Sequence, residues 1–172
     1  MKFGIFLLLL FSTALYADVT IPQKLIDHHT AVCSDFGTED GKYLLRAAYK
    51  LPKSPNSESI KTLYVLGCQM YAYNSLEKAY ILDSEENITD VYVVEIDEER
   101  SLTATNDLMG SDYDEASNTL GTFQKGRGIG DCGSTATYTY SSEVEKFILV
   151  QARLKNHCDG DVESEWPVVY SK

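Results

Sequence analysis

The pattern of hydrophobic and polar positions divides the chain into an apolar amino-terminal run, a short helical stretch and a longer series of strand-like segments. After the apolar run, hydrophobic positions recur near the helical period, and this predicts a helix over residues 21–34. Residues 35–41 are typical of a turn, and residues 52–57 are a loop by composition. The segment 42–50 fits either a strand or a helix.

The remainder of the chain favours strands. Short runs rich in Val, Ile, Tyr and Thr are separated by polar or glycine-containing turns. These runs cover residues 61–66, 79–83, 90–96, 135–140 and 146–152. Their short connections predict an antiparallel meander, and the longest irregular part is expected over residues 97–125. The expected fold class is therefore α+β, mainly antiparallel β with an amino-terminal helix.

The amino-terminal run has the features of a secretory signal. One lysine precedes the apolar segment 4–11, and the sequence Ala14-Leu15-Tyr16-Ala17 follows it. A membrane-spanning helix is disfavoured because it needs about 20 apolar residues, and this run is shorter. We therefore expect cleavage after Ala17, a periplasmic or secreted location, and one globular domain over residues 18–172 with no membrane span.

Composition and charge narrow the class of partner. The chain is 44% hydrophobic and 11% aromatic, which is enough for a core and argues against disorder. Its formal net charge is −11, and removal of residues 1–17 takes away one lysine and no acid, leaving −12. Nucleic acids and anionic lipids are disfavoured because this surface would repel them. A basic protein remains a possible partner.

Four cysteines follow the signal, namely Cys33, Cys68, Cys132 and Cys158. An even number in an exported chain predicts two disulfides. Three pairings are open, and locality favours Cys33 with Cys68 and Cys132 with Cys158. A zinc site is disfavoured because the chain has no Cys-x-x-Cys and no suitably spaced histidine pair.

Glycines concentrate in the segment 126–133. Gly128, Gly130 and Gly133 match G-x-G-x-x-G, the fingerprint of dinucleotide sites. That chemistry needs a helix after the glycines, whereas a strand-like pattern follows here and Asp131 lies inside the run. We therefore expect no nucleotide cofactor, and we assign the glycines to positive φ and close backbone approach beside a disulfide.

No motif identifies a catalytic or metal-binding residue. Adjacent His28 and His29 point about 100° apart on a helix, so they cannot share a metal as an i, i+4 pair does. The acidic stretch 159–163 superficially resembles a calcium loop but lacks its residue order and distal Glu, which favours a solvated loop. A pair of carboxylates for glycoside hydrolysis stays open, since only their spatial separation decides that chemistry.

Several segments together resemble a bacterial exported family, the domain of unknown function 1176. They are Gly126 to Gly133, the Tyr138-x-Tyr140 pair, Phe147 to Leu149, Cys158 to Gly160 with Trp166-Pro167, and Cys68 to Asn74. The likeness spans roughly residues 33–170 and is to the family's carboxyl-terminal domain. Tyr71 stands where the family has Gly, and Tyr138 and Tyr140 stand where Trp is usual. The resemblance implies the envelope of a Gram-negative bacterium, no established reaction and no catalytic residue.

The resemblance also implies a shared surface where the glycine-rich segment meets residues 68–74. Its candidate binding residues are Tyr73, Asn74, Arg127, Asp131 and Trp166. The alternative is that these side chains serve only in the core and in turns. Arg127 either binds an anion or pairs with Asp131.

Three functions are compatible with these observations. The first is a non-enzymatic exported binding or structural domain. The second is an acidic inhibitor of a basic hydrolase such as lysozyme, in which carboxylates steer the encounter. The third is a hydrolase that uses paired carboxylates.

Overall fold

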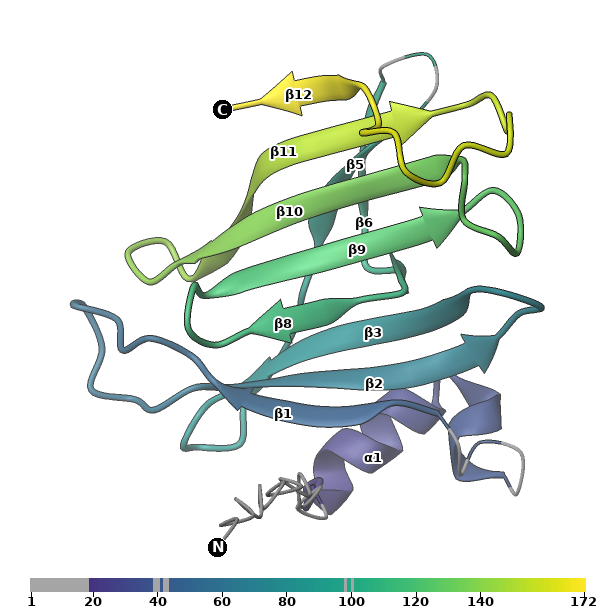
Figure 1. The fold of residues 1–172 in the computed structure, drawn as a ribbon. Coiled ribbons are helices and arrows are strands. Elements are labelled where there is room, and N and C mark those ends of the chain that lie inside the picture. The colour runs from purple at the N-terminus through teal and green to yellow at the C-terminus, as the bar shows by residue number, and fades with distance from the viewer. Residues whose placement is uncertain (1–18, 39–40, 42–43, 98, 100) are drawn as a thin grey trace, which may run out of the picture.

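A computed structural model describes residues 19–172, apart from residues 39–40, 42–43, 98 and 100 (Figure 1). The signal predicted over residues 1–17 lies outside the described residues. The elements in chain order are α1 (Gln23–Thr30), the 3-10 helix η1 (Ser34–Gly37), β1 (Arg46–Lys50), β2 (Thr62–Met70), β3 (Ser75–Leu82), β4 (Ile88–Asp90), β5 (Val93–Ile96), β6 (Leu102–Thr105), β7 (Leu108–Met109), β8 (Asp112–Asp114), β9 (Thr119–Lys125), β10 (Gly133–Ser141), β11 (Lys146–Lys155) and β12 (Val168–Ser171). No helix in this described part is long and apolar enough to cross a membrane.

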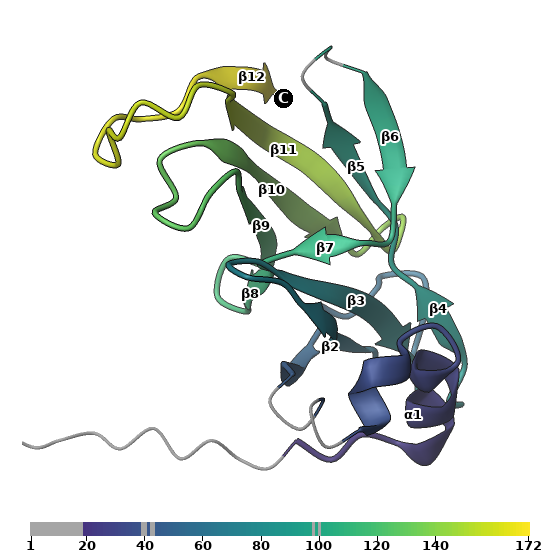
Figure 2. The same ribbon diagram turned by 90° about the vertical axis from the view of Figure 1, so that its right-hand side faces the viewer.

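The strands form two sheets and one separate hairpin. The first sheet has the order β1-β2-β3-β4, with β7 also paired to β3, and the second has the order β12-β11-β10-β9-β8. Strands β5 and β6 pair only with each other (Figure 2). Neighbouring strands are antiparallel and mostly consecutive in sequence. The predicted antiparallel meander with an amino-terminal helix is therefore confirmed, with little helix.

Strand β2 is buried on both faces, which explains its nearly continuous apolar sequence. Leu63 and Val65 point to a core shared with the second sheet, and Tyr64 and Leu66 point to a core under the helices. Strand side chains alternate between faces, so one strand serves both cores. The first sheet is thus a middle layer, with α1 on one side and the second sheet and the β5–β6 hairpin on the other (Figure 1).

Both predicted disulfides are present. Cys33, just after α1, is joined to Cys68 on β2. Cys132, at the end of the β9–β10 connection, is joined to Cys158, which follows β11. The locality argument therefore selected the correct pairing.

The helix predicted over residues 21–34 is shorter than expected. Helix α1 ends at Thr30, and Val32, placed on the apolar face by the sequence pattern, is 63% exposed. The chain turns away after His29 so that Cys33 reaches Cys68 and Phe36 of η1 packs edge-on to His29 at 4.5 Å between ring centroids. The ambiguous segment 42–50 contains strand β1.

The expectation of an irregular segment over residues 97–125 is wrong, because β6, β7, β8 and β9 lie within it. Three of these strands have four residues or fewer. Strands β6 and β8 form local hairpins with β5 and β9, and β7 pairs with the distant β3. The strand predicted over residues 90–96 is split between β4 and β5. The chain changes partner there from β3 to β6, and the Val91 amide still donates to Ala79 at 2.9 Å.

Candidate functional site

Two segments that the sequence analysis brought together do lie side by side. Asn74, in the β2–β3 turn, donates its side-chain amide to the Lys125 carbonyl at 2.9 Å. Its side-chain oxygen accepts the Lys125 backbone N–H, also at 2.9 Å. The Tyr73 hydroxyl donates to the Gly126 carbonyl at 3.2 Å. Both side chains therefore tie the first sheet to the start of the glycine-rich connection between β9 and β10.

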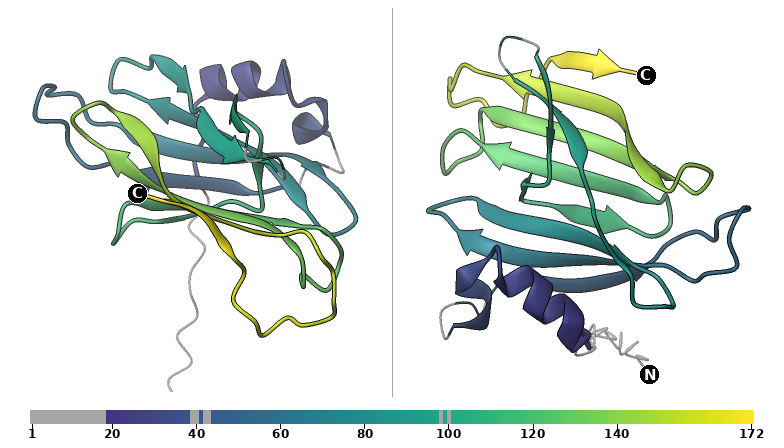
Figure 3. Two further views of the ribbon diagram at one scale, coloured as in Figure 1. Left: turned by 90° about the horizontal axis from the view of Figure 1, so that it is seen from above. Right: turned by 180° about the vertical axis from the view of Figure 1, so that it is seen from behind.

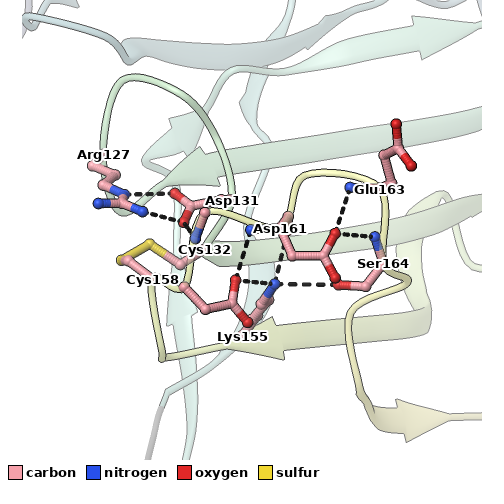
Figure 4. Close-up of polar contacts among 10 residues, drawn as sticks. Arg127, Asp131, Cys132, Lys155, Cys158, Asp161, Glu163 and Ser164 are labelled. Atoms are coloured by element: carbon pink, nitrogen blue, oxygen red, sulfur yellow. Dashed lines mark hydrogen bonds and ion pairs between the residues drawn. A yellow bond between two sulfur atoms is a disulfide. The ribbon is translucent and has the colours of Figure 1, made fainter.

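Arg127 and Asp131 form a two-pronged ion pair across that connection (Figure 4). The Arg127 Nε lies 2.6 Å from Asp131 Oδ1, and Nη2 donates to Oδ2. Asp131 is fully buried and also accepts the Gly160 amide at 2.6 Å. The guanidinium, followed by the Gly160 amide, holds the pKa of the Asp131 carboxyl well below its usual range. Of the two roles considered for Arg127, pairing with Asp131 is the one observed.

Replacing Asp131 with Asn is expected to loosen the attachment of the segment after β11. Asparagine keeps the shape but presents one oxygen where the carboxylate engages Arg127 and Gly160 with two. The Gly160 amide should then exchange with solvent about tenfold faster, measured by hydrogen exchange and NMR. Asp114→Asn is the control, since the Asp114 carboxylate accepts hydrogen bonds from Ala116 and Ser117 within its own turn. Unchanged Gly160 exchange would contradict this role of Asp131.

The glycine-rich segment has a structural explanation. Gly133 has φ +134°, and a Cβ there would lie 2.0 Å from the Gln124 carbonyl oxygen. Gly130 has φ +70°, and its amide closes a turn onto the Arg127 carbonyl at 3.0 Å. Strand β10 follows at Gly133, so no helix amino terminus is present to bind phosphate. These contacts agree with the assignment of the glycines to turn and close-approach chemistry.

Trp166 approaches the same region by packing against Phe123 of β9, with ring centroids 5.5 Å apart. Its carbonyl accepts a hydrogen bond from the Arg153 guanidinium at 3.0 Å. Trp166 therefore lies beside Phe123, whereas Arg127 and Asp131 belong to the β9–β10 connection, and Tyr73 and Asn74 contact the start of that connection. The hydrogen bonds of these five residues therefore join segments of the protein to one another.

The acidic stretch 159–163 surrounds a lysine (Figure 4). The Lys155 ammonium donates to the Asp159 carboxylate at 2.8 Å, the Asp161 carbonyl at 2.9 Å and the Ser164 hydroxyl at 3.2 Å. Asp161 also accepts the Glu163 and Ser164 amides at 3.0 Å. The Asp159 carboxylate is thus engaged by the Lys155 ammonium and the Asp161 carboxylate by backbone amides.

Metal-binding side chains lie close together at Asp131, Cys132 and Cys158 in the described part of the chain. Both sulfurs form the second disulfide, so they carry no thiolate for a metal. Asp131 is held by Arg127 and the Gly160 amide. This cluster therefore does not have the chemistry of a metal site.

A groove of about 600 Å³ lies between the β5–β6 hairpin and the inner face of the second sheet, a feature that the sequence analysis did not identify. Figure 3 shows the hairpin crossing this sheet. The lining combines apolar surface with polar side chains, among them Glu95, Thr103, Thr122, Gln124 and Ser134. The disulfide between Cys132 and Cys158 borders the same groove.

The groove exists because side-chain size falls along the inner face of β10. Tyr140 and Tyr138 fill the core at one end of this face, and Ala136 and Ser134 occupy the same face at the other end. Small residues leave space between the sheet and the hairpin where large ones would fill it. The Tyr138 hydroxyl donates to the Val94 carbonyl at 3.2 Å and fixes the hairpin at the edge of the core.

Glu95 is the functional candidate that the sequence analysis missed. It is paired in register with Thr103, so both side chains share one face of the hairpin and line the groove. Burial, with a smaller contribution from Asp107, raises the pKa of Glu95. Alternation along the strand could have identified it. Val91 and Val93 are buried, and Glu95 is the next residue on the same face of the strand.

Asp97 also lines the groove, but its carboxylate has a structural role. It accepts the Glu99 amide at 2.9 Å and the Ser101 amide at 2.8 Å, within the turn that joins β5 to β6. Such an arrangement is typical of an aspartate that caps a turn. Glu95 and Asp97 are therefore in different chemical environments.

The model of the family described as "Protein of unknown function (DUF1176)" matches residues 26–172. The Uncharacterized protein YpfG of Escherichia coli (strain K12) is 29% identical over 113 residues, which are 64% of this chain and 32% of that protein. The chain thus spans about a third of the length of this relative. No solved structure matches.

Proposed function

Because the chain belongs to the DUF1176 family, whose description names no activity, we propose its function from its own geometry. The protein is an exported, non-enzymatic binding domain that holds its ligand in the groove between the β5–β6 hairpin and the second sheet. In this proposal residues 18–172 act as one domain after removal of residues 1–17.

Export is supported by the covalent framework. The two disulfides each join distant elements, and such bonds persist in oxidising compartments. The apolar run followed by Ala17 supports the same location.

The groove is the observation that carries the binding role. Ligand sites are concave, of about 300–1,000 Å³, and present a few polar groups, and the groove of about 600 Å³ matches both features. Its walls are strands of a hydrogen-bonded sheet and a hairpin, so the polar side chains of Thr122, Gln124 and Ser134 are held at fixed spacings. Tyr73, Asn74 and Arg127, by contrast, make their hydrogen bonds to other groups of the protein.

The absence of catalysis is supported by the chemistry of the lining. Hydrolysis by paired carboxylates needs an acid and a base or nucleophile that are both available to the substrate. Of the two acids among the described lining residues, Asp97 accepts two turn amides and Glu95 lies opposite Thr103. A binding role therefore fits these residues better than an acid–base role.

Ser134→Tyr is expected to block the groove, because a large ring would occupy the space that serine leaves open. We would record amide NMR spectra with a defined set of amines, amino acids, dipeptides and oligosaccharides. Ligands should shift groove residues in the native protein and bind at least about tenfold more weakly to the variant.

The matched control is Thr137→Tyr, which adds the same ring to the opposite face of β10. It should leave binding unchanged. If no compound in the set shifts groove residues, or if binding survives Ser134→Tyr, the groove is not the binding site and the proposed function fails.

A further inference from the structure

Three basic residues border the groove with their backbones but stand opposite Gly133 or Thr135 in the sheet register, so their side chains lie on the face away from the groove. The Lys155 ammonium is held by the oxygens of residues 159–164. The Arg153 guanidinium donates to Gln151 at 2.9 Å, to Glu165 at 3.2 Å and to the Trp166 carbonyl. The Lys125 ammonium lies 5.8 Å from the centre of the Phe123 ring. The charges of Lys155 and Arg153 are therefore engaged by other groups, and Lys125 lies beside Phe123 on the face of the sheet away from the groove.

Glu95 presents the opposite charge on the groove side of the hairpin. It follows Val93 on the inward face, and Val93 is only 1% exposed. Among the described residues, none donates a hydrogen bond to the Glu95 carboxylate at accepted distances, whereas Asp97 accepts two. The carboxylate is thus available to a ligand in partly desolvated surroundings, where an opposite charge interacts more strongly than in water.

The rest of the lining argues against a sugar. The groove walls formed by described residues contain threonine, glutamine, serine and alanine but no aromatic ring on which a sugar could stack. The protein as a whole carries a net charge of −11, which attracts cations toward the opening.

We propose that the groove binds a cationic group of its ligand, a guanidinium or alkylammonium, against Glu95, with Thr103 and Thr122 as neutral hydrogen-bonding neighbours. This inference rests on the proposed function and adds the chemical class of the ligand. The same cation can belong to a small molecule or to an arginine or lysine side chain of a basic protein, and the experiment separates these sources.

The test compares two probes that differ in one charge. Arginine amide carries a guanidinium, and citrulline amide replaces it with a neutral group of nearly the same shape. Titration of the protein with both disulfides formed, followed by amide NMR, should show arginine amide shifting Glu95, Thr103 and Ser134. Citrulline amide should bind at least about tenfold more weakly.

Two variants assign the effect to Glu95. Glu95→Gln should reduce arginine amide affinity about tenfold, to the level of citrulline amide. Glu143→Gln removes the same charge from an exposed site in the turn at the other end of β10 and β11, and it should leave the affinity unchanged. Equal affinity for both probes, or equal loss in both variants, would overturn the proposal.

A third arm identifies the source of the cation. If hen lysozyme binds at low salt and Glu95→Gln weakens that binding together with arginine amide binding, the cation belongs to a protein side chain. If arginine amide binds and lysozyme does not, the ligand is a small cation. If oligosaccharides shift groove residues and arginine amide does not, this inference fails while the proposed function stands.

Discussion

Replacing Cys33 and Cys68 together with alanine is expected to lower the free energy of unfolding by about 4 kcal/mol. The bond closes a loop between residues 35 positions apart, so its loss releases a large conformational freedom in the unfolded chain. Both cysteines are buried at the contact of the helical layer with β2, at 2% and 8% exposure. We therefore expect the helical layer to lose its attachment before the second sheet unfolds.

Urea denaturation followed by circular dichroism measures this loss. Trp166 packs against Phe123 of β9 in the second sheet, so its fluorescence reports that sheet separately and serves as an internal comparison. A double variant whose unfolding free energy changes by less than about 1 kcal/mol would show that packing alone holds the helices.

His29→Ala is expected to destabilise the protein by about 3–5 kcal/mol, because it creates a cavity and removes two hydrogen bonds. The His29 ring is fully buried. Its Nε2 must donate to the Gly67 carbonyl, 3.0 Å away, since a carbonyl only accepts. Nδ1 therefore accepts from the Tyr80 hydroxyl at 2.7 Å. Alanine would leave both Gly67 and Tyr80 without their buried partner.

The same histidine makes stability depend on pH. Burial, as the largest cause, lowers the pKa of His29 below its ordinary value of 6.5. The unfolded chain therefore takes up a proton near pH 6.5 while the folded protein stays neutral to lower pH. The stability is fully present above that pH and is lost as the pH falls toward the folded pKa.

Urea midpoints measured from pH 7.5 to 5 should fall with pH in the native protein and change less in His29→Gln. The control is His28→Gln, because His28 is its exposed neighbour and pairs with Asp90 at 3.2 Å. If the pH dependence disappears in His28→Gln and persists in His29→Gln, it comes from His28, and the prediction for His29 is wrong.

Local chemistry in the sequence determined several features of this protein. The even number of cysteines and their spacing selected the disulfides, and Val, Ile and Tyr runs located β2, β3, β10 and β11. Gly126, Gly130 and Gly133 were assigned correctly, because a positive φ and a close contact are demands on single residues. Family membership was also recognised from short segments of this kind.

The tertiary structure decided what depended on distant partners. Strands β6 to β9 were missed because their sequences lack runs of Val, Ile and Tyr. They are ordered by pairing, β7 with the distant β3 and the other three with strands next to them in sequence. The groove was missed for a related reason, since it arises where small residues of β10 face a hairpin that pairs with neither sheet. Glu95 occupies the next position in an alternating series of buried valines, and only the folded chain shows that this position faces open space. A sequence fixes which way a side chain points along its strand, whereas the space that it enters is formed by other segments.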